Sequence, residues 1–150
     1  MAYTTINKSS LHHDGKIYLG SSSAVTVTGL GFQPDLVWVK DRDNGNNNCL
    51  ADSVRGVGKF VLPNEGDAEV DNSTKAFSAF TSDGFTTGTD NPANESASTT
   101  KGFMSWSWKA GGAGSSNTDG TINTTSTSVN TTAGFSISTY TAVSYTHLRA

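Results

Sequence analysis

The sequence predicts an all-β fold, an antiparallel β-sandwich or jelly roll, and three observations favour it. Ser, Thr, Asn and Gly supply 69 of the 150 residues, a composition typical of short strands joined by polar turns. Several stretches alternate apolar and polar residues with the period of two that half-buried strands show. Strong helix formers such as Ala, Leu, Glu and Lys are scarce, and no segment shows a convincing helical period.

The first predicted strands are KIYLG at 16–20 and AVTVT at 24–28, where valine and threonine alternate. A turn at 29–34 contains two glycines and a proline, which block a helix. The stretch DLVWVK at 35–40 is apolar at both its odd and its even positions. We therefore expect a central strand covered on both faces, followed by a polar loop at 41–48.

The middle of the chain alternates short strands and polar loops. CLADSV and RGVGKFVLP are expected to be strands, and the acidic stretch at 64–75 is expected to be a loop. Asp83 and Gly84 lie between phenylalanine-rich segments and are suited to a two-residue hairpin turn. The segment at 89–101 is predicted to be another exposed polar loop.

The stretch FMSWSWKA at 103–110 has the clearest alternation. Met104, Trp106 and Trp108 share one face, and the two serines share the other. We expect this aromatic face, together with Trp38, to lie in the core. The alternative is that the indoles stack on sugar rings, as aromatic side chains do in glycan-binding modules.

Composition also limits the partners. The net charge is −3 and no basic stripe occurs, which argues against nucleic acid. No apolar run approaches the ~20 residues that a membrane span needs. The N-terminus lacks the apolar segment of a signal peptide. The single cysteine, Cys49, is expected to be a buried, inert thiol, so synthesis in a reducing cytoplasm is predicted.

The loop at 41–48 contains two aspartates that are candidate calcium ligands. Asp41, Asp43 and Gly45 resemble the start of an EF-hand loop, but that loop needs Gly at position 6 and Glu at position 12. Here Gly stands at position 5 and the twelfth residue is Asp52. We expect no cofactor and no metal site. Asp41 and Asp43 are the candidates if calcium binds, and a solvated loop is the favoured interpretation.

No motif predicts catalysis. The chain has no GxSxG, no phosphate-binding loop and no dinucleotide fingerprint. Its glutamates lie in loop-like stretches, where the paired carboxylates of a glycosidase are not expected. We therefore predict that the chain is not an enzyme. Surface contacts, if any, are expected in the loops, and the candidate residues are Asn44, Asn46, Asn47 and Tyr140.

Long, ordered blocks of the chain resemble a domain of unknown function that is widespread in proteins of tailed phages, notably marine and metagenomic ones. These blocks are VTGLGFQPDLVWVKDR (27–42), FTSDGFTTGTD (80–90), FMSWSWKAGG (103–112) and SNTDGTINTTSTSVNTTAGFSISTYT (116–141). Such proteins are usually labelled virion structural or tail-fibre-like. The resemblance implies a β-sandwich of the jelly-roll or concanavalin A-like lectin type.

The resemblance also implies a function. The leading expectation is a non-catalytic structural module of a phage virion, in a tail fibre or appendage, whose loops are displayed for host attachment. The alternatives are a lectin-like glycan-binding module and an accessory domain of a tailspike depolymerase. The expected partners are other virion proteins, a host surface glycan or protein, and further copies of the chain. The expected location is the virion, after synthesis in the host cytoplasm.

Composition and the family resemblance together predict how the chain is divided. A β-sandwich module is expected over 1–112 and a Gly/Ser/Thr-rich linker or edge segment over 113–133. In the resembling family, a block like GFSISTYT opens a second copy of the unit, so 134–142 is expected to be the first strand of a truncated repeat. Residues 143–150 depart from the family pattern and look like a non-native tail.

Overall fold

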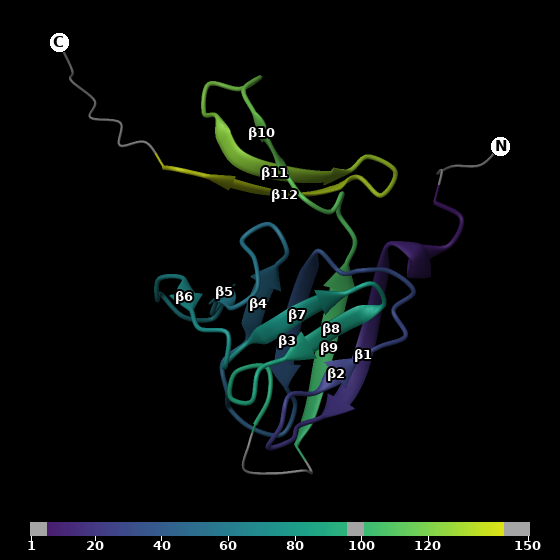
Figure 1. Ribbon diagram of the computed structural model, residues 1–150, viewed down its shortest axis with the longest axis vertical. Coiled ribbons are helices and arrows are strands. Elements are labelled where there is room, and N and C mark those ends of the chain that lie inside the picture. The colour runs from purple at the N-terminus through teal and green to yellow at the C-terminus, as the bar shows by residue number, and fades with distance from the viewer. Residues whose placement is uncertain (1–5, 96–100, 143–150) are drawn as a thin grey trace.

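The computed structural model describes residues 6–95 and 101–142, and this part of the chain is built almost entirely from β-strands. Its one short helix is the 3-10 turn η1 (Ser9–Leu11), and no α-helix occurs in the described residues. The strands pair antiparallel and pack as a sandwich (Figure 1). The predicted all-β antiparallel sandwich is therefore confirmed, and the arrangement is compatible with the jelly-roll type.

Two sheets form the sandwich and a third lies beyond one end of it (Figure 1). The six-stranded sheet has the order β1 (His13–Leu19), β9 (Gly102–Trp108), β3 (Leu36–Asp41), β4 (Cys49–Asp52), β5 (Lys59–Val61) and β6 (Val70–Asp71). The facing sheet has the order β2 (Thr26–Val27), β8 (Gly84–Thr87) and β7 (Phe77–Thr81). The third has the order β10 (Ser115–Asn117), β11 (Thr124–Asn130) and β12 (Phe135–Tyr140).

The core lies between the six-stranded sheet and the β2–β8–β7 sheet. Four phenylalanines fill most of it, and each is at most 2 % exposed: Phe60, Phe77, Phe85 and Phe103. Strand alternation places Val37 and Val39 of β3 in the same layer, both fully buried. Burial of these side chains is the main term that stabilises the sandwich.

The tryptophan prediction was wrong about which face of the sheet is inside. In β9 the buried residues are Phe103, Ser105 and Ser107, whereas Trp106 and Trp108 lie on the outer face and are half-buried. Alternation shows which residues share a face, but the register decides which face is inward. Phe103 pairs with the buried Tyr18 and Asp41, and these pairings fix the inner row.

β3 lies inside the sheet, as predicted, but only one of its two faces is covered by other residues, whereas both were expected to be. The strand lies inside the six-stranded sheet, between β9 and β4. Its inner side chains are fully buried, but Trp38 on the outer face is 39 % exposed. One face of this strand packs on a second sheet and the other is open to solvent.

The hairpin expected at Asp83–Gly84 forms one residue earlier. Thr81 pairs with Gly84, so Ser82 and Asp83 are the two turn residues. A Cβ atom built on Gly84 would lie 1.9 Å from the carbonyl oxygen of Val27. Gly84 is therefore needed for the close approach of β8 to β2 rather than for the turn.

The third sheet is joined to the sandwich through Asp35, which is 2 % exposed. Its Oδ2 atom accepts hydrogen bonds from the backbone N–H groups of Ala110 (2.7 Å) and Gly112 (3.2 Å). Phe135 of β12 stacks on Trp108 with 6.4 Å between ring centroids. Of the predicted linker at 113–133, the segments 115–117 and 124–130 form β10 and β11. In the segment 134–142, predicted to be the first strand of a second repeat, residues 135–140 form β12. The predicted tail at 143–150 lies outside the described residues.

Candidate functional site

Asp41 ends β3 and organises the loop that follows. The residue is buried, with 1 % of its surface exposed. Oδ1 accepts the backbone N–H groups of Asp43 (2.9 Å) and Asn44 (3.0 Å), and Oδ2 accepts the side-chain amides of Asn44 (3.1 Å) and Asn46 (2.6 Å). Burial by itself raises the pKa of Asp41, but these hydrogen bonds outweigh it and hold the pKa below its usual value.

Asp43, the other residue considered for calcium, has a different partner. Its Oδ2 atom accepts the backbone N–H of Gly102 at 2.6 Å, which ties the loop to the start of β9. Both carboxylates therefore already accept hydrogen bonds from backbone N–H groups. Among the residues that the structure describes, no group of three His, Cys, Asp or Glu side chains is close enough to hold a metal ion.

Asn44 and Asn46 connect this loop to the segment 91–95 and to Lys101. The amide of Asn44 donates to Glu95 Oε2 (3.0 Å), and its oxygen accepts from Lys101 Nζ (2.6 Å). The amide of Asn46 donates to Asn91 Oδ1 at 3.2 Å. These two predicted contact residues are half-buried and serve first to fix one loop against the other.

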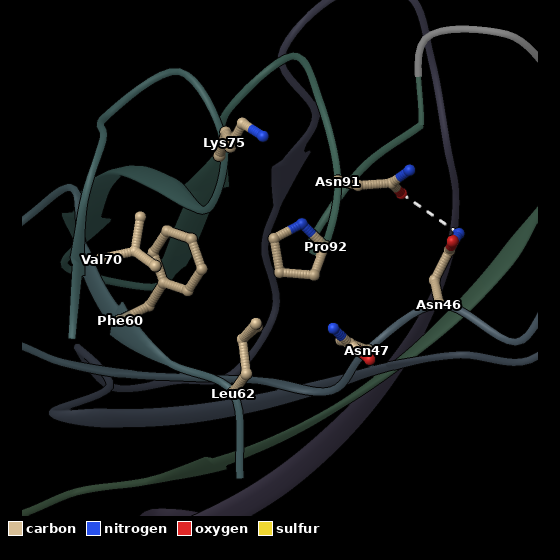
Figure 2. Close-up of a pocket in the computed structure, with 8 residues that line it drawn as sticks. All are labelled: Asn46, Asn47, Phe60, Leu62, Val70, Lys75, Asn91 and Pro92. Atoms are coloured by element: carbon tan, nitrogen blue, oxygen red, sulfur yellow. Dashed lines mark hydrogen bonds between the residues drawn. The ribbon is translucent and has the colours of Figure 1, made fainter. Parts of the chain in front are cut away.

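A pocket of about 240 Å³ opens between these loops (Figure 2). Figure 2 shows the asparagines on one side, Phe60 and Val70 on the other, and Pro92 between them. Of the four predicted contact residues, the pocket brings together two, Asn46 and Asn47, and is not lined by Asn44 or Tyr140. Its lining residues are Asn46, Asn47, Phe60, Leu62, Val70, Lys75, Asn91 and Pro92.

The buried Asp41 determines how two amides of the pocket are oriented. A carboxylate only accepts hydrogen bonds, so Asn46 must turn its NH₂ group toward Asp41. The same NH₂ group donates to Asn91, so Asn91 presents its oxygen to Asn46, and its own NH₂ group has no hydrogen-bond partner among the described residues. Asn47 is oriented separately, because its Oδ1 atom accepts the amide of Asn64 at 2.8 Å.

Sequence reasoning missed the rest of this pocket. Lys75, Asn91 and Pro92 lie in or next to segments predicted only as exposed polar loops, and Phe60 and Leu62 belong to or follow a predicted strand. No spacing in the sequence indicates that these segments meet. The order β3–β4–β5–β6 brings Phe60 and Val70 to this part of the sheet, and the hydrogen bond from Asn46 joins the loop of Asn91 to it.

Tyr140 lies elsewhere, near the end of β12. It is 61 % exposed and borders an open hollow of about 540 Å³ between the third sheet and the β4–β5 region. Arg55 and Glu69 line the sandwich side of that hollow and form a 3.0 Å ion pair. The predicted contact residues therefore belong to two separate surfaces.

The outer face of the six-stranded sheet is a second surface of interest. Trp38, Trp106 and Trp108 line a shallow pocket of about 310 Å³, and the first two rings are 6.2 Å apart. Beside them on β1, Ile17 is 64 % exposed and pairs with Met104. We call this surface, formed by Ile17, Trp38, Met104, Trp106 and Trp108, the aromatic face.

Cys49 is fully buried, and burial raises the pKa of its thiol far above the usual range. The thiol is therefore protonated at neutral pH. The described residues include no helix long and apolar enough to cross a membrane.

Comparison with known proteins gives one result. No curated protein and no solved structure matches the chain. Residues 8–148 match a family described as Domain of unknown function (DUF7483). The match covers nearly the whole sequence, including all three sheets of the structure. The chain therefore belongs to the DUF7483 family of domains of unknown function.

Proposed function

We propose that this chain is a non-catalytic structural module of a tailed-phage virion, in a tail fibre or similar appendage, that holds preformed loops toward a host surface. The phage setting rests on the resemblance of the sequence blocks. The physical role rests on one observation, which is that buried side chains fix the loops at one end of the sandwich to one another. Rigid scaffolds that present loops are a common basis for recognition.

Two buried residues carry that observation. Asp41 fixes the loop at 42–48 through four hydrogen bonds. Asn94 is fully buried and accepts the backbone N–H groups of Ser21 and Glu95, both at 2.8 Å. Its NH₂ group donates to the carbonyls of Ser23 and Gly88, both at 2.9 Å. Three loops, at 21–23, 42–48 and 88–95, are thereby ordered before any partner binds, which reduces the entropy lost on binding.

The same contacts support a non-catalytic role. The carboxylates of the loop region accept hydrogen bonds from neighbouring amides, and Asp41 is held in its charged form. A general acid would need a raised pKa and a nucleophile would need access to a substrate. Asp41 and Asp43 instead hold the loop at 42–48 in place through hydrogen bonds to backbone N–H groups.

We also propose that the aromatic face packs against a second copy of this chain. Its exposed side chains are large and apolar, and monomeric proteins rarely leave such contiguous surfaces open. Only tryptophans line its central pocket. Lys40 of β3 also lies on this outer side, beside Met104, but most of the surface is apolar. A largely apolar surface can pack against a copy of itself, and two such sheets can lie face to face about 10 Å apart.

The virion assignment can be tested in particles of a phage that encodes this chain. Mass spectrometry of purified virions should detect the protein. Its copy number should be a multiple of the number of subunits that the symmetry of the appendage requires. Antibodies against the recombinant chain should label the tail or its fibres in electron micrographs. Absence from washed, gradient-purified particles, with the protein present in the infected-cell lysate, would rule the proposal out.

A further inference from the structure

The pocket of Figure 2 contains hydrogen-bonding groups that the scaffold leaves free. Asn47 uses its oxygen for Asn64, and its NH₂ group has no partner among the described residues. In Figure 2 this nitrogen is turned toward Leu62 and Pro92. The NH₂ group of Asn46 donates to Asp41 and Asn91, and its Oδ1 atom accepts no hydrogen bond from the residues that the structure describes. The pocket therefore offers both donors and an acceptor to a ligand.

Lys75 adds a positive charge to this pocket. Its ammonium group takes part in none of the ion pairs or side-chain hydrogen bonds within the described residues. The pocket lining contains no carboxylate that could neutralise it. Although the chain as a whole is acidic, the end of this pocket at Lys75 favours an anionic group. Asn47 lies across the pocket from Lys75, beyond Pro92 (Figure 2), and offers its NH₂ group to a neutral oxygen of the same ligand.

The remaining lining is apolar. Phe60, Leu62, Val70 and Pro92 provide carbon surface opposite the asparagines (Figure 2). A volume of about 240 Å³ is below the roughly 300–1,000 Å³ of sites for drug-sized ligands. One six-membered ring with polar substituents suits this space better than a peptide or a flat aromatic cofactor.

We infer that this pocket binds one acidic sugar unit of a surface glycan. The carboxylate of the sugar lies at Lys75, its C–H face lies on Leu62 and Pro92, and its hydroxyl groups reach the amides of Asn46, Asn47 and Asn91. This inference deepens the proposed attachment function and rests on it. The chain of hydrogen bonds from Asp41 through Asn46 to Asn91 fixes the amides in advance, as a sugar site requires.

Binding at a single pocket of this kind is weak, because Lys75 is exposed and few groups contact the sugar. Repetition along an appendage compensates, since several modules that engage one glycan surface increase the overall avidity. The charge contact also predicts that binding weakens as the ionic strength rises.

The test is an NMR titration of the full, isotopically labelled chain with tri-galacturonate, and with its fully methyl-esterified form as the uncharged control. The acidic trisaccharide should shift the backbone amides of residues 46, 47, 62, 75 and 91. Removing the charge, by the methyl ester or by Lys75→Gln, should weaken binding about threefold to fivefold. Asn47→Asp keeps the acceptor for Asn64 but repels the anion, and should weaken binding at least as much.

Lys8→Gln is the matched control, because Lys8 is an exposed lysine outside the pocket; it should leave binding unchanged. Galacturonate monomer should shift the same amides, which distinguishes recognition of one unit from recognition of a longer chain. Equal binding of acid and ester, shifts away from the pocket, unchanged affinity in both pocket variants, or no binding each overturns the inference. None of these results affects the virion assignment, which particle composition decides.

Discussion

Asp41 is a buried carboxylate whose hydrogen bonds lie at the end of a central strand and hold the following loop. Such a group stabilises the fold only in its charged form, since a protonated carboxyl loses part of its capacity to accept. Ser107 is the opposite case, a buried hydroxyl without a hydrogen-bond partner among the described residues. We therefore expect replacement of Asp41 to lower the stability of the fold, and replacement of Ser107 by alanine to leave it unchanged or raise it.

Replacement of Asp41 by Asn should destabilise the chain by about 2 kcal/mol at pH 7, because the new NH₂ group faces the amide of Asn46 and a charge-assisted network is lost. In the unfolded chain the pKa of Asp41 is about 3.9. In the folded chain the pKa is lower than this value. Its contribution is therefore complete above about pH 4 and is lost as the pH falls through the folded pKa.

Urea unfolding of the wild type and of Asp41→Asn between pH 2.5 and pH 7 measures this difference. The two stabilities should converge as the pH drops below about 4. Asp67→Asn, at an exposed loop position, is the control and should change little. A constant difference across the whole pH range would contradict the role given to the charge.

Ser107→Ala should leave stability unchanged or raise it by about 0.5 kcal/mol, because it removes a buried hydroxyl that is not compensated by a hydrogen bond. Ser105→Ala is the matched comparison two residues away on the same inner row. Ser105 donates to the carbonyl of Lys16 at 3.2 Å, so its loss should cost about 1 kcal/mol. Thermal and urea unfolding of both variants should rank Ser107→Ala above Ser105→Ala, and the reverse order would show that Ser107 has a partner.

At the scale of elements, the contact between β2 and β8 depends on a glycine. Strand β2 has only two residues and joins the sandwich through its pairing with β8, in which Thr26 faces Thr86 and Val27 faces Phe85. Gly84 begins β8 directly beneath the carbonyl of Val27. Because backbone atoms rather than flexible side chains lie at this contact, relaxation cannot easily relieve an added methyl group.

Gly84→Ala should therefore destabilise the chain by about 3 kcal/mol, as a clash that forces two strands apart. Gly66→Ala is the control, since no atom lies within 4 Å of a Cβ built there; it should change stability by less than about 0.5 kcal/mol. Equilibrium unfolding of both variants, with hydrogen exchange at residues 26–28, checks the expectation. Equal stability of the two variants would contradict it.

At the scale of the whole molecule, the six-stranded sheet has one face that is covered by the second sheet and one face that is open to solvent. The inner face of the six-stranded sheet packs against β2, β8 and β7, whereas its outer face exposes the aromatic face. The third sheet contacts the rim of that face through Phe135 and Trp108. The arrangement leaves space for a neighbouring subunit beside Trp38.

Self-association through the aromatic face predicts that the wild-type chain sediments as an oligomer and that Ile17→Ser and Trp38→Ser shift it toward the monomer. Both side chains are exposed on the outer face, so their replacement should reduce association more than folding. Val57→Ser, at a position 49 % exposed outside this face, should leave the oligomer intact. Sedimentation velocity at several concentrations measures this, and a monomeric wild type would contradict the proposed contact.

Part of the candidate site followed from the sequence. The run of asparagines after β3 correctly indicated polar loop residues, and Asn46 and Asn47 do line the pocket. The sequence could not show that Asn46 is oriented by Asp41, because that depends on which way the loop folds back. It also could not place Lys75 and Pro92 beside them, since these contacts span several strands of the sheet.

The sequence by itself determined the all-β class and the positions of most strands, because composition, turn residues and the period of two act locally along the chain. Only the tertiary structure decided which side of β9 and β3 is buried. A period of two is the same pattern whichever face is inward, and the choice depends on the register with neighbouring strands. The same non-local pairing brings the loops together into one pocket and leaves the tryptophans on the surface.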